Sequence, residues 1–123
     1  MAKLILVIDD GPEQRRFLER TLSAAGYRVV TAPDDQAGTA AARSLLPDLI
    51  ILDVMMPGMN GYQVCRTLKG DPATTDRPIL VLTAKDEPTD HFWAREVGAE
   101  DFITKPVDLP ELIRRIEELT ERR

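Results

Sequence analysis

The sequence reads Leu49-Ile50-Ile51-Leu52-Asp53 near its middle, a short aliphatic run that stops at a carboxylate. Three other runs also stop at a polar side chain: Leu4–Ile8 before Asp9-Asp10, Ile79–Leu82 before Thr83, and Phe102–Thr104 before Lys105. Runs this short, aliphatic and bounded by polar residues predict buried strands of a parallel sheet. Ligands of such sheets bind beyond the carboxyl ends of the strands. We therefore expect these polar residues to form one site.

Helical patterns alternate with the strands, which is typical of βαβ units. Residues 28–32 supply a fifth strand. Five helices are expected, over about residues 12–25, 35–46, 60–69, 89–97 and 108–119. Right-handed crossovers then place helices on both faces of the sheet. The pattern predicts an α/β three-layer sandwich in a single domain that spans residues 1–123.

The first two helices have recognisable ends and faces. Asp10 can cap the first helix, and Gly26 ends it. Asp34 or Asp35 can cap the second helix. Arg15 is expected to point outward from the first helix. The expected buried faces are Phe17, Leu18 and Leu22 in the first helix, and Ala37, Ala40, Ala41 and Leu45 in the second.

Composition excludes several classes of protein. The 123 residues suffice for one core. A formal net charge of -5 argues against direct nucleic-acid binding, which needs a basic surface. The single cysteine, Cys65, allows no internal disulfide and favours a reducing compartment, and it is interpreted as a small buried or half-buried side chain. No segment approaches the roughly 20 apolar residues of a spanning helix, so we expect a cytoplasmic protein without membrane insertion.

The strand-end carboxylates indicate a metal site. Asp9, Asp10 and Asp53 would repel one another at one edge of the sheet, and a divalent cation would relieve that repulsion. Mg²⁺ prefers oxygen ligands and keeps several waters beside one or two carboxylates. Such a site leaves room for a phosphoryl oxygen.

The same residues suit phosphoryl transfer. Asp53 is the natural nucleophile, because a carboxylate can take a phosphoryl group as an acyl phosphate. Lys105 offers a positive charge and Thr83 a hydroxyl for the phosphoryl oxygens. There is no GxxxxGK[ST] loop, so the donor should be another protein or a small acyl phosphate.

Taken in order, these motifs resemble the receiver domain of two-component response regulators over essentially the whole chain. The matching segments are Asp9-Asp10, residues 53–61 (DVMMPGMNG), Thr83-Ala84 and residues 98–106 (GAEDFITKP). The resemblance implies a flavodoxin-like (βα)5 fold with sheet order 2-1-3-4-5. It also implies a phosphoprotein that catalyses only its own aspartyl phosphorylation and dephosphorylation.

The resemblance assigns a role to each site residue. A sensor histidine kinase or a histidine phosphotransfer protein would phosphorylate Asp53, with help from Thr83 and Lys105. Mg²⁺, or Mn²⁺, would be held by Asp10, Asp53 and the main-chain carbonyl of Met55, with Asp9 acting through water. The Lys105–Pro106 peptide bond is expected to be cis.

Thr83 and Phe102 occupy the positions of the switch pair in this resemblance. Phosphorylation would change the face formed by the fourth helix, the fifth strand and the fifth helix, which would bind a downstream protein of unknown identity. The chain would be a monomer or a phosphorylation-dependent dimer. Neither Met55 nor Lys85 suits the alignment of an attacking water, so we expect a long-lived phosphoform.

Two other functions compete with this one. An aspartate-nucleophile phosphohydrolase uses the same residue types, but such enzymes carry a DxD pattern and a cap domain, for which this length leaves no room. A phosphorylation-independent adaptor would need none of the site residues. The sequence does not identify the cognate kinase, the pathway or the target, or whether the chain stands alone.

Overall fold

A computed structural model describes residues 2–53, 55–56, 59–83, 96 and 98–121. Five parallel strands form the central sheet: β1 (Leu4–Ile8), β2 (Arg28–Ala32), β3 (Leu49–Asp53), β6 (Ile79–Thr83) and β7 (Asp101–Thr104). Their spatial order is β2-β1-β3-β6-β7. Counting these five strands along the chain, the predicted order 2-1-3-4-5 is confirmed.

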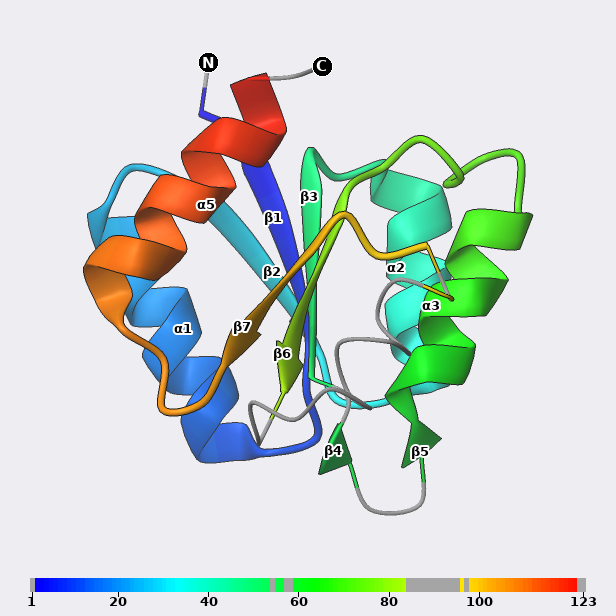
Figure 1. Ribbon diagram of the computed structural model, residues 1–123, viewed down its shortest axis with the longest axis horizontal. Helices are drawn as coiled ribbons and strands as arrows, with labels where there is room; N and C mark the ends of the chain where they lie inside the picture. Colours follow the sequence, from blue (N-terminus) through cyan, green and yellow to red (C-terminus); the bar gives the residue numbers. More distant parts are fainter. Residues whose placement is uncertain (1, 54, 57–58, 84–95, 97, 122–123) are drawn as a thin grey trace.

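Helices cover both faces of this sheet, as predicted. The described helices are α1 (Pro12–Ala24), α2 (Asp35–Leu45), α3 (Gly61–Gly70) and α5 (Leu109–Glu121). In Figure 1, α1 and α5 lie on one face, while α2 and α3 lie on the other. The helix expected over residues 89–97 lies outside the described residues, apart from Glu96. No helix in the described part of the chain is long and apolar enough to cross a membrane.

Two apolar clusters form the core, one on each face of the sheet. Successive strand side chains point to opposite faces, so Leu6 and Ile8 pack toward one cluster while Ile5 and Val7 pack toward the other. Strands buried on both faces are continuous aliphatic runs for this reason. Cys65 is fully buried, as expected, and burial raises the pKa of its thiol to about 12.

Helix α1 differs from expectation at its start and on its face. Gly11, not Asp10, is the N-cap, and Asp10 is exposed. The Asp9 carboxylate accepts the Gly11 N–H at 2.8 Å. Leu18 and Leu22 are buried, but Phe17 is 48% exposed. The helix ends before Gly26, whose φ of 99° favours glycine, as predicted.

Helix α2 is capped as expected but buries a different face. Asp34 Oδ1 accepts the Ala37 N–H at 2.8 Å. Gly38 and Ala42 are the buried residues, Ala41 is half-buried, and the expected inner residues Ala37, Ala40 and Leu45 are exposed. A side chain at Gly38 would place its Cβ 2.6 Å from Ile8 Cδ1. The helix lies so close to β1 at this point that its inner face carries a glycine where we expected alanines.

A small hairpin follows β3 that the sequence did not predict. β4 (Met55–Met56) pairs antiparallel with β5 (Met59–Asn60), directly before α3. In Figure 1 it lies at the end of the molecule toward which the β6 and β7 arrows point. The backbone that follows Asp53 is thereby kept at the carboxyl end of the sheet.

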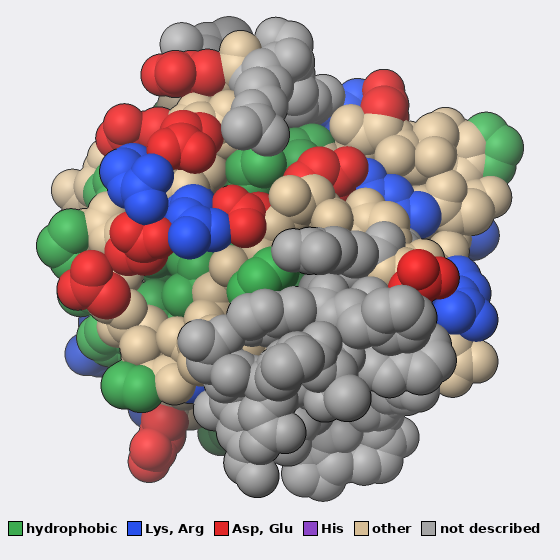
Figure 2. Space-filling model, viewed as in Figure 1, with side chains coloured by type: hydrophobic (Ala, Val, Ile, Leu, Met, Phe, Trp, Pro, Cys, Tyr) green, Lys and Arg blue, Asp and Glu red, His purple; other side chains and the backbone are tan. Residues whose placement is uncertain are grey.

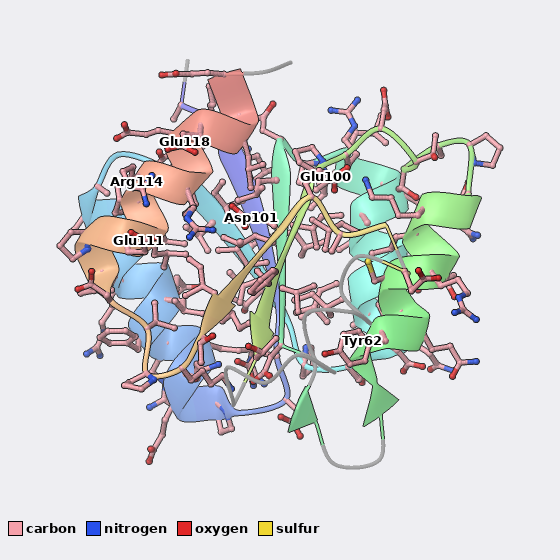
Figure 3. The ribbon with its side chains drawn as sticks, in the orientation of Figure 1. Tyr62, Glu100, Asp101, Glu111, Arg114 and Glu118 are labelled. Carbon is pink, nitrogen blue, oxygen red and sulfur yellow. The ribbon has the colours of Figure 1, made fainter. Side chains whose placement is uncertain are left out.

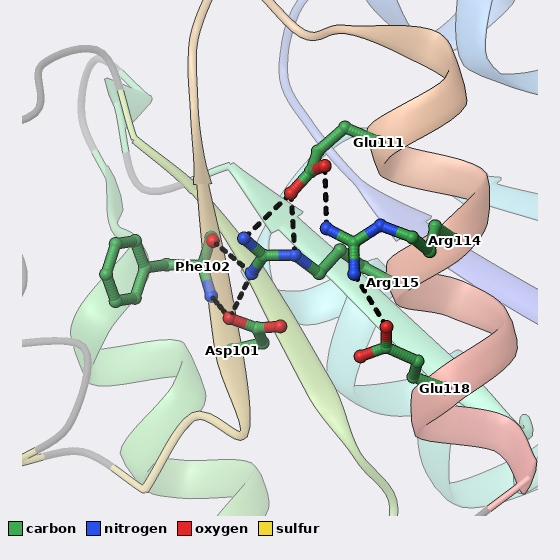
Figure 4. Close-up of polar contacts among 6 residues, drawn as sticks. All are labelled: Asp101, Phe102, Glu111, Arg114, Arg115 and Glu118. Carbon is green, nitrogen blue, oxygen red and sulfur yellow. Dashed lines mark hydrogen bonds and ion pairs between the residues drawn. The ribbon is translucent and has the colours of Figure 1, made fainter.

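The outer surface of α5 carries interleaved charges (Figure 2). Arg114 bridges Glu111 and Glu118, each at 2.7 Å. Arg115 bonds Asp101 of β7 at 2.6 Å and Glu111 at 2.8 Å (Figure 4). The pair Arg115–Asp101 ties α5 to the edge strand of the sheet.

Candidate functional site

The polar residues predicted from the strand ends come together at the carboxyl edge of the sheet. Asp53 and Thr83 are the last residues of β3 and β6, which are neighbours. Asp9 directly follows β1, and Lys105 directly follows β7. Because all four strands are parallel, their carboxyl ends share one edge, which confirms the expected convergence.

Asp53 is a buried carboxylate with a cationic partner. It is 3% exposed, and its Oδ2 lies 2.6 Å from Lys105 Nζ. The Lys105 main-chain N–H donates to the Thr83 carbonyl at 2.7 Å, which fixes the start of the lysine side chain. A buried charge needs such pairing to be tolerated.

Asp9 is the second buried carboxylate of the site. It is 2% exposed. Its two oxygens accept the Gly11 N–H, at 2.8 Å, and the side-chain amide of Gln14. Burial is the main cause that raises the pKa of Asp9 above 3.8, and the negative charge of Asp53 adds to it.

Thr83 presents a buried hydroxyl that finds no hydrogen-bond partner among the described residues. The residue is fully buried, and its Oγ1 has no partner within the described part of the chain. An unsatisfied buried hydroxyl is costly and calls for an explanation. Phe102 on β7 is half-buried and packs against the apolar cluster on the α2–α3 face.

Other expected site residues are less close together. Asp10 is exposed, and the described residues contain no group of three or more His, Cys, Asp or Glu side chains that could hold a metal ion. Met55 lies in β4, two residues beyond Asp53, and Lys85 lies outside the described residues. The Lys105–Pro106 bond is cis, as predicted.

Two residues of α1 contact the site without having been predicted. Gln14 Nε2 donates to the Oδ2 atoms of both Asp9 and Asp53, the latter at 3.2 Å. Arg15, expected to point outward, donates from Nη1 to the Asp9 carbonyl at 2.7 Å. Pro12 at the first helical position was the available signal, because it places Gln14 in the first turn of a helix that begins beside the carboxylates.

Comparison with known proteins identifies the family of this chain. The family model of the response regulator receiver domain matches residues 5–117. Protein PilH of Pseudomonas aeruginosa is 39% identical over 112 residues, which cover 91% of this chain and 93% of PilH. Response regulator PleD of Caulobacter vibrioides is 48% identical over 120 residues, but the chain, 98% of which is matched, spans only 26% of PleD.

Solved structures show the same fold. The chemotaxis protein CheY4 of Vibrio cholerae superposes with a TM-score of 0.91 at 30% identity, covering 97% of this chain and 99% of that one. The signal receiver domain of a histidine kinase from Syntrophus aciditrophicus gives 0.89 at 37% identity, with 98% and 91% covered.

The general function of this family is phosphorylation on an aspartate, and its members generally bind Mg²⁺ at the phosphorylation site. They interact with histidine kinases and downstream effectors. With the family model matching nearly the whole chain and the parallel sheet in the family's order, this chain belongs to the response regulator receiver domains of two-component systems.

Proposed function

We propose that Asp53 is the phosphoacceptor and that a sensor histidine kinase or histidine phosphotransfer protein is its donor. One observation carries the proposal: a buried carboxylate at the end of central strand β3 pairs with Lys105 Nζ at 2.6 Å. Lys105 comes from a different strand end, so its positive charge lies where a phosphoryl group on Asp53 would need it.

The transfer follows from these groups. An Asp53 oxygen attacks the phosphorus of a phosphohistidine, the new O–P bond forms, and the N–P bond breaks. The electron pair of that bond stays on the leaving imidazole nitrogen, which takes a proton. Lys105 then shifts from the carboxylate to a phosphoryl oxygen, and the Thr83 hydroxyl donates to another. Thr83 Oγ1 has no partner among the described residues, so it is available for that bond.

The donor set fits a hard divalent cation. Asp9 and Asp53 are two buried carboxylates that share one amide donor, and their mutual repulsion favours a cation between them. Asp9, Asp10, Asp53 and the main-chain carbonyl of Met55 would hold Mg²⁺ or Mn²⁺. The ion would supply positive charge to the phosphoryl oxygens opposite Lys105.

Phosphorylation would then act as a switch. We propose that Thr83 moves toward the phosphoryl group and that Phe102 turns inward. Phe102 is half-buried on the neighbouring strand β7, in register with Val81, which lies two residues before Thr83. The face that includes β7 and α5 would change its shape and bind a downstream protein. The phosphoform would be long-lived, and a half-life of seconds for the purified phosphoprotein would contradict this.

Incubation with acetyl phosphate and Mg²⁺, followed by intact-mass measurement, tests the phosphoacceptor. We expect a gain of one phosphoryl group, lost in Asp53→Asn and retained in Asp48→Asn. Asp48 is a matched control because its carboxylate sits at the opposite end of the sheet, where it accepts the Leu4 N–H at 2.8 Å. An asparagine there can still accept that bond.

Each alternative gives a different result. Rapid turnover of varied phosphate esters would favour a phosphohydrolase. No adduct with acetyl phosphate or with candidate kinases would favour a phosphorylation-independent adaptor. Gel filtration with and without phosphorylation distinguishes a constant monomer from a phosphorylation-dependent dimer.

A further inference from the structure

Gln14 links the two buried carboxylates of the site. Its Nε2 donates to Asp9 Oδ2 and to Asp53 Oδ2, the second at 3.2 Å. An amide NH₂ group has two hydrogens to donate, so these bonds use both of them. Asp53 Oδ2 also receives Lys105 Nζ at 2.6 Å. Among the residues that the structure describes, Gln14 is therefore the side chain that bonds to both Asp9 and Asp53.

We propose that Gln14 sets the metal affinity of this receiver by competing with the divalent cation for the same carboxylate oxygens. This inference rests on the proposed function, in which Asp9 and Asp53 hold Mg²⁺. Bonds from the amide stabilise the metal-free arrangement of two like charges. A cation that binds to those oxygens must displace the Gln14 amide. Because the amide hydrogen bonds are then lost, the cation binds less tightly. Gln14 is thus a positioning residue, not a metal ligand.

The other groups around the carboxylates do not take this role. The Gly11 N–H is bonded to Asp9 Oδ1 alone, and Lys105 is bonded to Asp53 alone. Arg15 binds the Asp9 main-chain carbonyl, not its carboxylate. Gln14 comes from the first turn of α1, so its side chain can swing outward without moving the strands.

The substitution Gln14→Met tests the competition, because methionine has a similar length and no donor. Mg²⁺ binding is measured by isothermal titration calorimetry of the unphosphorylated protein. We expect the dissociation constant to fall on the order of tenfold, since a hydrogen bond to a charged group is lost only from the metal-free state. Gln36→Met is the matched control, because Gln36 lies exposed in the first turn of α2.

The unsubstituted protein provides a second measurement in case the variant folds poorly. In an NMR titration with Mg²⁺, the Gln14 side-chain amide signals should shift toward those of an exposed glutamine, while those of Gln36 stay constant. An unchanged or increased dissociation constant in Gln14→Met, or an unmoved Gln14 signal at saturation, would overturn the inference. If the unsubstituted protein bound no Mg²⁺ at all, both this inference and the proposed metal site would fall.

Discussion

The two ends of the central sheet use carboxylates in opposite ways. At the amino end, Asp48 accepts the Leu4 N–H, and Glu100 accepts the Ile79 N–H, both at 2.8 Å. Lys69 Nζ forms an ion pair with Glu100 Oε2 at 2.6 Å. These carboxylates satisfy the first N–H of strands β1 and β6. Figure 3 shows Glu100 at the end of the molecule away from the β4–β5 hairpin.

At the carboxyl end, Asp9 also accepts a main-chain N–H, from Gly11, but Asp9 and Asp53 in addition share one side-chain donor. Gln14 is divided between them, and Asp53 Oδ2 takes Lys105 as well. Thr83 beside them has an unsatisfied hydroxyl within the described residues. Asp48 and Glu100 accept the N–H groups that begin strands and so hold the sheet together, whereas Asp9 and Asp53 are bridged by a side-chain amide that a ligand can replace.

Replacing Lys105 by methionine should show the largest effect on stability. Asp53 would keep a buried charge without a cation, a change that costs about 3 to 5 kcal/mol for fully buried pairs. The Lys105 side chain is 25% exposed, so we expect the free energy of unfolding to fall by about 2 kcal/mol without Mg²⁺. Urea unfolding at neutral pH measures it. Mg²⁺ should restore part of the loss, and no recovery would contradict the assignment of this end as a metal site.

Glu100→Gln, at the amino end of the sheet, should lower the free energy of unfolding by a smaller amount. Mg²⁺ should not restore this loss. Glutamine can still accept the Ile79 N–H but loses the charge that Lys69 pairs with. Because the Glu100 side chain is 36% exposed, we expect a loss of about 1 kcal/mol in the same urea experiment. A loss that Mg²⁺ reverses would show that the two ends are not independent.

Asp9→Asn should increase stability in the absence of metal. Burial raises the folded-state pKa of Asp9 above 3.8, so its favourable contribution is complete below that pH and is lost as pH rises through the raised value. Asparagine stays neutral and avoids the loss. We expect a gain of up to about 1 kcal/mol at neutral pH that disappears toward low pH. A variant less stable than the unsubstituted protein at neutral pH would contradict the like-charge repulsion.

Arg114→Ala should have the smallest effect on stability. It serves as a reference for charged residues that lie at neither end of the sheet. Its bonds to Glu111 and Glu118 lie on the exposed face of α5 (Figure 4). Exposed pairs of this kind contribute little that can be measured. We expect no change in the thermal midpoint or in phosphorylation by acetyl phosphate. A clear loss of stability would mean that the α5 charges act as a network.

Part of the candidate site could be read from the sequence because its signals are local. Asp9, Asp53, Thr83 and Lys105 each end an aliphatic run, and parallel strands bring such ends together. Helix faces were less predictable. Phe17 and Leu45 are apolar but exposed, and the inner face of α2 includes Gly38, where an added Cβ would lie 2.6 Å from Ile8 Cδ1.

The sequence by itself determined the alternation of strands and helices, the parallel sheet and the strand ends that carry the chemistry. Periodicity and polar boundaries are properties of neighbouring residues, so they are visible without a structure. The tertiary structure decided which side chains connect those ends. Gln14 contacts Asp53 across 39 positions of sequence, and Arg15 turns inward to Asp9. Such partners depend on how α1 packs against the sheet. Pro12 indicates where the helix begins, but it does not indicate which carboxylates the first turn contacts.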